Sequence, residues 1–258
     1  MNIYSWNVWD DNKTPELVLK FIQQLDFDIL CLQEVPESLL QKLSVLPYAQ
    51  VHFVDLTRLR PEKEETCYLV ILTHYHIIHH SSFLTCPKPV YPLRTRAFLG
   101  LGLFGFTRLK DHGALYADIR IPGSEHPIRV FSLHLRLSGP VERQKELALV
   151  SSHMNKAYPT MVCGDFNIID QPLQKSFSWL LGSSIREALP WYPERRRMEQ
   201  QFDGLGLKNV LRGKKTNTRF ANQLDHILVP KEFSVTAAGV CENSFGSDHY
   251  PVYVTIKS

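Results

Sequence analysis

The sequence of 258 residues has few cysteines, no long apolar run and no strong excess of charge of either sign. Its five cysteines lie at positions 31, 67, 86, 163 and 241, and no two of them form a Cys-x-x-Cys pair. This odd number and wide spacing fit neither a zinc site nor a disulfide framework. Cys31 and Cys163 lie within apolar runs, which predicts that both fill the core.

The sequence also lacks the run of about 18 apolar residues that a membrane-spanning helix needs. Residues 1–7 contain no basic segment followed by an apolar one, so nothing in them indicates secretion, and we expect a cytoplasmic protein. No low-complexity segment, fixed-period repeat or evident linker divides the chain. Together with 44% hydrophobic residues, these absences predict a single domain over residues 1–258.

The net charge of +3, with a pI near 8.5, permits a polyanionic partner without requiring one. Local clusters are more informative. Arg94 and Arg96 alternate within the proline-containing segment 84–97, and the basic clusters 195–197 and 212–215 flank aromatic residues. Basic residues interleaved with aromatic ones suit phosphate contact combined with base stacking. Solvated loops would explain the same clusters.

Apolar and polar residues alternate over residues 2–8, which predicts a strand with Asn7 near its end. Residues 14–25 follow with an N-cap, an early proline and apolar residues at helical spacing. The apolar run 28–34 then predicts a strand buried on both faces that ends on Glu34. A strand–helix–strand unit of this kind would bring Asn7 and Glu34 to the same edge of a sheet.

The middle of the chain shows further strand and helix patterns. The predicted strands cover residues 48–56, 68–73, 76–83, 98–106, 114–121 and 128–134. The predicted helices cover residues 36–45, 140–155, 173–181 and 184–189, and the predicted loops include residues 57–66 and 84–97.

A second strand–helix–strand succession contains the most informative stretch of the sequence. Its first strand ends on His134, and its second, Met-Val-Cys-Gly-Asp-Phe-Asn over residues 161–167, delivers Asp165 and Asn167. Residues two positions apart in extended backbone point to the same side, so these two polar groups can converge on one ligand. A carboxylate can orient water while a carboxamide holds an oxygen of an anionic ester. Taken alone, the stretch favours a hairpin turn, because Gly, Asp and Asn are all common in turns.

Polar side chains recur at the ends of apolar strands along the whole chain. They are Asn7, Glu34, His134, Asp165, Asn167, Asp225, Asp248 and His249. Turns alone do not readily account for six such strand ends, so we predict that they form one functional site. The histidines at 74, 76, 79 and 80 alternate irregularly, which favours surface or edge positions over a metal site.

In this combination the chain resembles the endonuclease/exonuclease/phosphatase superfamily, which has the deoxyribonuclease-like fold. The matching motifs are Trp6-Asn7, Gln33-Glu34, Ser132-Leu133-His134-Leu135, Gly164-Asp165-Phe166-Asn167, Leu224-Asp225-His226-Ile227 and Ser247-Asp248-His249. The resemblance implies an α/β fold, namely a four-layer α/β/β/α sandwich with two mixed β-sheets packed face to face and helices outside. It is specific for the superfamily but not for a substrate.

The resemblance also implies a metal and a nucleophile. Glu34, assisted by Asn7 and Asp248, would bind Mg²⁺ or Mn²⁺, because hard oxygen ligands without thiolates suit these ions. Asp165 would orient and deprotonate the attacking water. The cation would offset the repulsion between these acids and an anionic substrate.

Further roles fall to the remaining motif residues. Asn167 and His249 would hold the non-bridging phosphate oxygens, and Asp225 would pair with His249 and keep it protonated. His134 would contact the phosphate or help to protonate the leaving oxygen. The reaction rate is therefore expected to fall in alkali, as the two histidines lose their protons.

The chain departs from the superfamily pattern at the phosphate contacts. Many members carry an arginine where this sequence has His112-Gly113, and Arg143 or Arg219 could replace it. The substrate-binding candidates are Arg94, Arg96, Arg143 and Arg219. Relatives with a histidine at the position of His134 often pair it with an upstream acid, for which Glu64 and Glu65 are the candidates.

Phosphoryl transfer depends chiefly on stabilising negative charge, so a cation and hydrogen-bond donors at the phosphate carry most of the catalysis. The favoured interpretation is a divalent-metal-dependent phosphodiester hydrolase, a nuclease acting on DNA or RNA by water attack on phosphorus. A phosphatase or phosphodiesterase of a small-molecule or lipid phosphoester is the alternative. A binding module without catalysis is disfavoured, because no expected acid or amide is missing. The sequence leaves the oligomeric state open.

Overall fold

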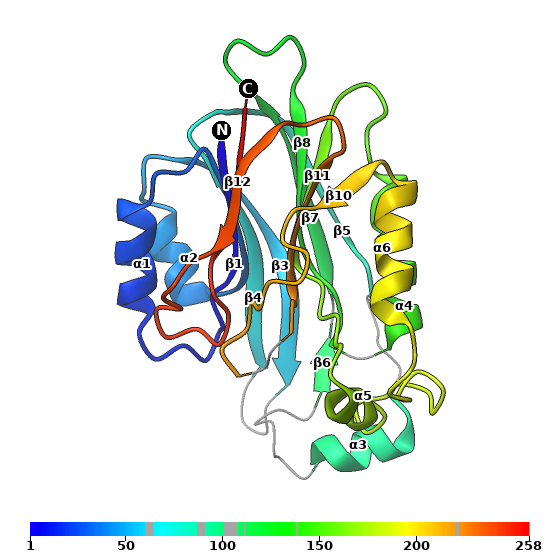
Figure 1. Ribbon diagram of the computed structural model, residues 1–258. Helices are drawn as coiled ribbons and strands as arrows, with labels where there is room; N and C mark the ends of the chain where they lie inside the picture. Colours follow the sequence, from blue (N-terminus) through cyan, green and yellow to red (C-terminus); the bar gives the residue numbers. More distant parts are fainter. Residues whose placement is uncertain are drawn as a thin grey trace.

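The computed structural model describes residues 1–59, 64–86, 91–100, 108–110, 112–137, 139–219 and 222–257. Within these residues, strands form a seven-stranded and a six-stranded β-sheet, both mixed, which pack face to face. Helices α1 and α2 cover the outer face of the first sheet, and α4 and α6 cover that of the second (Figure 1). The predicted four-layer α/β/β/α sandwich is confirmed.

The first sheet contains a parallel pair of strands, β1 (Asn2–Asn7) and β2 (Ile29–Pro36), which helix α1 (Pro15–Gln24) connects. Pro15 suits the first turn of α1, where no backbone N–H is needed. Helix α2 (Glu37–Leu43) follows β2. The spatial order of the sheet is β12 (Val235–Val240), β13 (Val252–Ile256), β1, β2, β4 (Glu64–Thr73), β3 (Ala49–Leu59) and β6 (Arg108–Lys110).

The second sheet repeats this arrangement with β8 (Ile128–His134) and β9 (Thr160–Asp165), which are parallel and connected by helix α4 (Pro140–Ser152). Its spatial order is β10 (Leu207–Asn209), β11 (Asp225–Pro230), β9, β8, β7 (Gly113–Arg120) and β5 (His76–Leu84). The last residue of β8 lies beside the last residue of β9, and the antiparallel β11 begins beside the same residue. Three polar strand ends thereby become neighbours.

Apolar side chains fill three layers of the sandwich. The layer between the sheets includes Cys31 and Cys163, as predicted. Val18 and Ile22 of α1 pack on the outer face of the first sheet, and Leu147 of α4 packs on the outer face of the second. Because central strands bury both faces, they appear in the sequence as apolar runs rather than as alternating patterns.

Gly164 allows β8 and β9 to approach each other directly beside Asp165. Its φ angle is 144°, and a Cβ atom at this position would lie 2.0 Å from the carbonyl oxygen of Leu133. Any side chain would therefore push the two strands apart. The glycine of the Gly-Asp-Phe-Asn motif is therefore needed for β8 and β9 to pair closely beside Asp165.

Two predicted loops are wrong because they contain regular structure. Residues 57–59 continue β3 and residues 64–66 begin β4, so both described ends of the charged segment belong to paired strands. Helix α3 (Leu93–Gly100) replaces the end of the predicted loop over 84–97 and the start of the predicted strand over 98–106. The rest of that strand, residues 101–106, lies outside the described residues.

The helices after β9 also differ from prediction. Helix α5 (Pro172–Ser178) is shorter than predicted, and residues 184–189 form turns instead of a helix. Helix α6 (Glu194–Gly204) contains the basic cluster 195–197. The buried apolar residues of this helix are Met198 and Phe202, and the segment around them is strongly charged. Because only two apolar residues mark the buried face, the helical pattern is weak in the sequence.

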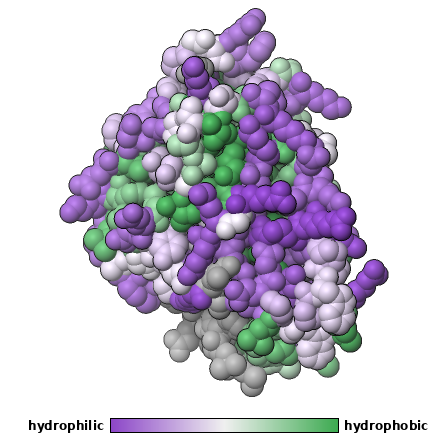
Figure 2. Space-filling view, in the orientation of Figure 1, coloured by the Kyte–Doolittle hydropathy of each residue, from purple (hydrophilic) through white to green (hydrophobic). Residues whose placement is uncertain are grey.

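The surface in the view of Figure 2 is mainly hydrophilic, with hydrophobic residues visible in its upper middle, at its left and at its lower right. Leu93 of α3 and Leu173 of α5 are among the exposed large hydrophobic residues of this lower end. No helix in the described part of the chain is long and apolar enough to span a membrane.

Candidate active site

The polar strand ends singled out from the sequence lie together at one end of the sandwich, at the bottom of Figure 1. They surround a cleft of about 500 Å³. The predicted site residues that line it are Glu34, His134, Asp165, Asn167, Asp248 and His249. Asn7 and Asp225 lie behind this lining and form hydrogen bonds to it. All eight predicted metal-binding and catalytic residues therefore belong to one cluster.

Asp165 lies at the centre of the cluster and is almost completely buried. Its Oδ2 atom accepts a hydrogen bond from Asn7 Nδ2 at 3.2 Å, and it lies 3.7 Å from the Nε2 atoms of both His134 and His249. Its Oδ1 atom accepts a hydrogen bond from the backbone N–H of Asn167 at 2.9 Å. One carboxylate oxygen thus faces two imidazoles, while the other fixes the turn that follows β9.

His249 is held by both its side chain and its backbone. Its Nδ1 lies 2.8 Å from Asp225 Oδ2, so the pair implied by the resemblance is formed. Its backbone oxygen accepts a hydrogen bond from Trp6 Nε1 at 3.1 Å. Burial lowers the pKa of His249, but the charges of Asp225 and Asp165 outweigh this effect and raise it to about 10. His249 is therefore a cation at neutral pH, with Nε2 turned toward Asp165.

His134 has an equivalent partner that the sequence did not reveal. Its Nδ1 lies 3.0 Å from Asp55 Oδ2, and Asp55 also accepts a hydrogen bond from the backbone N–H of Glu34. Burial lowers the pKa of His134, but the charge and hydrogen bond of Asp55 outweigh it, so the pKa rises to about 10. The prediction of Glu64 or Glu65 as the partner is wrong, because both pair with the end of β3 instead.

A signal for Asp55 is present in the sequence. Within the alternating strand β3, Asp55 falls in phase with Val51, at a position where an apolar residue would face the interior. A fully buried acid at such a position indicates a partner of opposite charge. A register shift between Val54 and Leu56 accompanies Asp55, and bulges of this kind re-aim side chains near functional sites.

Glu34 and Asn7, two of the predicted metal ligands, are hydrogen-bonded to each other. Glu34 Oε1 accepts a hydrogen bond from Asn7 Nδ2 at 3.1 Å, and Oε2 pairs with Arg58 Nη2 at 2.7 Å. Burial raises the pKa of Glu34 to about 7. A buried carboxylate beside Asp165 and Asp248, with no thiolate among them, is a donor set that suits Mg²⁺ or Mn²⁺.

A second grouping, of atoms that could hold a metal ion, overlaps the predicted catalytic residues. Single ligand atoms of Asp165, Asp225 and His249 lie within 4.8 Å of one another, and all three residues are buried. Asn7 contributes in a different way from the prediction, because its side-chain oxygen accepts a hydrogen bond from the backbone N–H of Trp9. Its amide nitrogen faces the carboxylates of Glu34 and Asp165 and holds them together.

Backbone strain gathers at this site. Trp9, Glu34 and Asn167 all have positive φ angles, of 57°, 52° and 51°, although none is a glycine. Each of the three also lines the cleft. Such conformations cost about 1–3 kcal/mol each and persist where the surrounding structure enforces them, commonly at functional sites.

Of the four predicted substrate-binding arginines, the structure places only Arg219 in the lining of the cleft. Arg219 lines the cleft, with its guanidinium over the Trp9 ring at 4.9 Å. Arg143 does not reach the cleft lining: it is 1% exposed, pairs with Glu194, and donates to backbone carbonyls. The prediction that Arg143 clamps a phosphate is therefore wrong, because its charge and donors are already used inside the protein.

Arg94 and Arg96 lie on helix α3 and not in an extended loop. Arg94 donates to the backbone oxygens of Trp179 and Ser183, and it borders a separate cavity. Arg96 belongs to neither the cleft lining nor that cavity. Arg58, which lies in the segment 57–66 that was predicted to be a loop, is the second arginine of the cleft lining. Its ion pairs with Glu34 and Asp10 hold it there.

Comparisons with solved structures agree with this architecture. A functionally unknown conserved protein from Enterococcus faecalis V583 is 16% identical, with a TM-score of 0.70 and coverage of 100% of this chain and 99% of the other. A mannosyl-6-phosphatase of Bacteroides thetaiotaomicron VPI-5482 is 17% identical, with a TM-score of 0.61 and full coverage of both chains. The human Nocturnin catalytic domain with bound sulfate is 16% identical, with a TM-score of 0.61 and coverage of 100% and 94%.

Sequence comparison identifies the family directly. No curated protein matches the sequence. A family profile, described as the Endonuclease/Exonuclease/phosphatase family, matches residues 4–249. Enzymes of this family are hydrolases that act on phosphoester bonds, and they generally depend on a divalent metal ion. With the match extending from β1 to the last histidine of the cleft, the chain belongs to the endonuclease/exonuclease/phosphatase family.

Proposed function

We propose that the protein is a Mg²⁺- or Mn²⁺-dependent phosphodiesterase that cleaves nucleic acid by attack of water on phosphorus. The observation that carries this proposal is Asp165 Oδ2 lying 3.7 Å from Nε2 of both His134 and His249. A carboxylate between two imidazolium groups provides a base for water and two cationic donors for a phosphate in the same cleft.

The residues of the chain divide the chemistry as follows. Asp165 orients the attacking water and accepts a proton from it. The hydrogen bond from Asn7 Nδ2 holds this carboxylate in position. His249, kept protonated by Asp225, donates to a non-bridging phosphate oxygen. His134, kept protonated by Asp55, donates to the phosphate or to the leaving oxygen. Asn167 directs the second N–H of its amide to the phosphate, while the first donates to Leu135 O.

Glu34 and Asp248 would hold the metal ion, with Asn7 fixing the carboxylate of Glu34. The ion would supply Lewis-acid stabilisation of the negative charge that develops on the phosphoryl oxygens. Until it binds, burial disfavours the charged form of Glu34, which accounts for the raised pKa of this group. Metal binding would therefore displace a proton from Glu34 over the range near neutral pH.

Residues that line the cleft support nucleic acid as the substrate. The guanidinium of Arg219 lies over the ring of Trp9, and Phe177 of α5, which is 47% exposed, lines the same cleft. A cation combined with exposed aromatic rings suits a phosphate flanked by a base.

A small or lipid phosphoester is the second candidate substrate, and the wall of the cleft favours it. Leu137, Leu173 and Phe177 present exposed apolar surface to the cleft, and Leu173 is 83% exposed. An acyl chain would bury this surface as well as a base would. The two candidates share the catalytic residues and differ only in the group attached to the phosphate.

A substrate panel tests the proposal. Single- and double-stranded DNA and RNA, inositol phosphates, sphingomyelin and mannose 6-phosphate are each incubated with Mg²⁺, with Mn²⁺ and with EDTA. We expect hydrolysis of oligonucleotides only with metal, and an apparent affinity that falls steeply with salt. Activity in EDTA would contradict the mechanism, whereas hydrolysis of the small or lipid esters alone would identify the second candidate.

The Asp55–His134 pair should determine the alkaline limit of the reaction. Because the pKa of His134 is about 10, its protonated form persists below that pH and is lost above it. Asp55→Asn removes the opposing charge, so the pKa falls and activity should be lost at a pH lower by about one unit or more. The pH profile of kcat/KM measures this shift. Glu64→Gln is the matched control and should leave the limit in place; an unshifted Asp55→Asn profile would remove Asp55 from the mechanism.

A further inference from the structure

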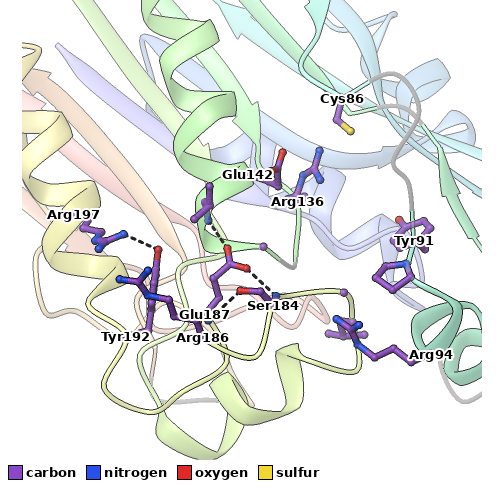
Figure 3. Close-up of a pocket in the computed structure, with 15 residues that line it drawn as sticks. Cys86, Tyr91, Arg94, Arg136, Glu142, Ser184, Arg186, Glu187, Tyr192 and Arg197 are labelled. Carbon is purple, nitrogen blue, oxygen red and sulfur yellow. Dashed lines mark hydrogen bonds between the residues drawn. The ribbon is translucent and has the colours of Figure 1, made fainter.

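A second cavity, of about 870 Å³, lies beside the cleft and takes no part in the chemistry described above. Helix α3, the N-terminal end of α4 and the segment 181–192 enclose it (Figure 3). Leu181 lines both this cavity and the catalytic cleft, and Arg136 of the cavity precedes Leu137 of the cleft. The two spaces are therefore neighbours that share Leu181 in their linings.

Arginines from four separate segments surround the cavity. They are Arg94, Arg136, Arg186 and Arg197. Figure 3 shows them distributed around the space rather than gathered on one side of it. Four guanidinium groups around one cavity repel one another unless anions balance their charge.

Only one of these arginines has a carboxylate partner among the described residues. Arg136 pairs with Glu146 at 2.8 Å. Arg94 donates to the backbone oxygens of Trp179 and Ser183, and Arg197 donates to the hydroxyl of Tyr192. These acceptors are neutral and leave the positive charge uncompensated.

Arg186 has no hydrogen bond or ion pair from its guanidinium to the part of the chain that the structure describes. Glu142, an acid of the lining, is already paired with Lys145 at 2.7 Å. Glu187 is occupied by the backbone N–H groups of Val141 and Ser184, at 2.9 and 2.8 Å. Three of the four arginines thus have no carboxylate partner among the described residues, and in the lining only the charge of Glu187 remains to oppose them. The cavity therefore carries an excess of positive charge.

We propose that this cavity binds a second phosphate of the substrate, the one adjacent to the scissile phosphate in an oligonucleotide. The proposal rests on the proposed nuclease function and deepens it. Arg186 and Arg197 contact the second phosphate, while Leu137 and Leu181 contact the nucleoside between the two phosphates. Guanidinium groups suit this role because they bind phosphate oxygens through paired N–H donors. A lipid phosphodiester with one phosphate would leave the cavity unused.

The test compares dinucleotides that have one bridging phosphate and carry no terminal phosphate, a 5′-phosphate or a 3′-phosphate. For the wild-type protein with Mg²⁺, we expect one phosphorylated form to have a kcat/KM about tenfold above that of the unphosphorylated dinucleotide, mainly through KM. In Arg186→Ala/Arg197→Ala this ratio should fall to about one. Equal rates on all three dinucleotides in the wild type would overturn the proposal.

A charge-matched control separates local contact from general attraction. Arg120→Ala/Lys20→Ala also removes two positive charges, but Arg120 lies at the far end of β7 and Lys20 lies on α1. This variant should keep the preference for the phosphorylated dinucleotide. If it loses the preference as fully as Arg186→Ala/Arg197→Ala does, then overall charge explains the effect and the cavity does not.

Equilibrium binding separates failure of this proposal from failure of the proposed function. Calorimetric titration of Asp165→Asn with the same dinucleotides measures binding without hydrolysis. A preference for a phosphorylated dinucleotide that disappears with Arg186→Ala/Arg197→Ala supports the second phosphate site even if the wild type hydrolyses none of them. Hydrolysis of all three dinucleotides, with equal affinities for them, would retain the nuclease function and reject the site.

Discussion

Asp165→Asn should lower kcat by about three orders of magnitude and leave the fold intact, as expected for removal of a general base. The carboxamide has the same shape and can still accept the hydrogen bond from the backbone N–H of Asn167. It cannot accept a proton from water at neutral pH, and it no longer attracts the imidazolium groups of His134 and His249. Single-turnover kinetics with saturating Mg²⁺ measure the effect on the chemical step.

The control for this variant is an acid outside the site. Asp203→Asn changes an exposed carboxylate on α6 that pairs with Lys231 and should leave kcat within about twofold, because surface pairs of this kind contribute little. Circular dichroism and thermal unfolding establish that Asp165→Asn is folded. A loss of less than tenfold in a folded Asp165→Asn variant would mean that another group activates the water.

His249→Gln should lower kcat by about two to three orders of magnitude, the cost of losing one preorganised donor to a developing oxyanion. Glutamine can still donate a hydrogen bond, but it carries no charge. It also leaves the buried carboxylate of Asp225 without its cation. The loss therefore combines weaker stabilisation of the phosphoryl oxygens with a disturbed charge balance beside Asp165.

The pH dependence distinguishes these contributions. The pKa of about 10 means that His249 stays protonated through neutral pH and loses its proton as the pH rises through 10. In His249→Gln this titration is absent, so the alkaline fall in kcat/KM should reflect His134 alone. The exposed His126 supplies the control, since His126→Gln should change neither rate nor profile. A His249→Gln variant with a rate within threefold of wild type would exclude His249 from the phosphate site.

Local patterns were sufficient to find the residues that cluster at the cleft because chain topology brings strand ends together. The connection through helix α1 places β1 parallel to β2, so Asn7 and Glu34 meet at one edge of the sheet. The same rule joins His134 and Asp165 at the ends of β8 and β9. In each case the order of strand, helix and strand can be read from apolar periodicity within about 40 residues.

Contacts between distant segments could not be read in this way. Asp55 lies 79 residues from His134, and it reaches the histidine only because β3 joins the opposite sheet and its register shifts beside Val54. The alternation of β3 marks Asp55 as an inward-facing acid, but no local pattern shows that it contacts His134. Asp55, Glu64 and Glu65 have the same chemistry, and only the packing of one sheet on the other selects among them.

The arginines show the same limit. In the sequence, Arg58, Arg143 and Arg219 are equivalent cations, since a guanidinium carries the same charge wherever it lies. Burial against Glu194 gives Arg143 a structural role, whereas Arg58 and Arg219 remain at the cleft. Burial depends on which segments pack together, and this information is not contained in any short stretch of residues.

The sequence by itself identified the eight polar residues at strand ends, because periodicity and strand order depend on neighbours along the chain, and the motifs that these residues form implied the four-layer architecture through their resemblance to the family. The tertiary structure alone decided which acid holds His134, which arginines face the cleft, and that four others enclose a second cavity. These decisions follow from long-range packing, in which distance through space, burial and charge replace position in the sequence.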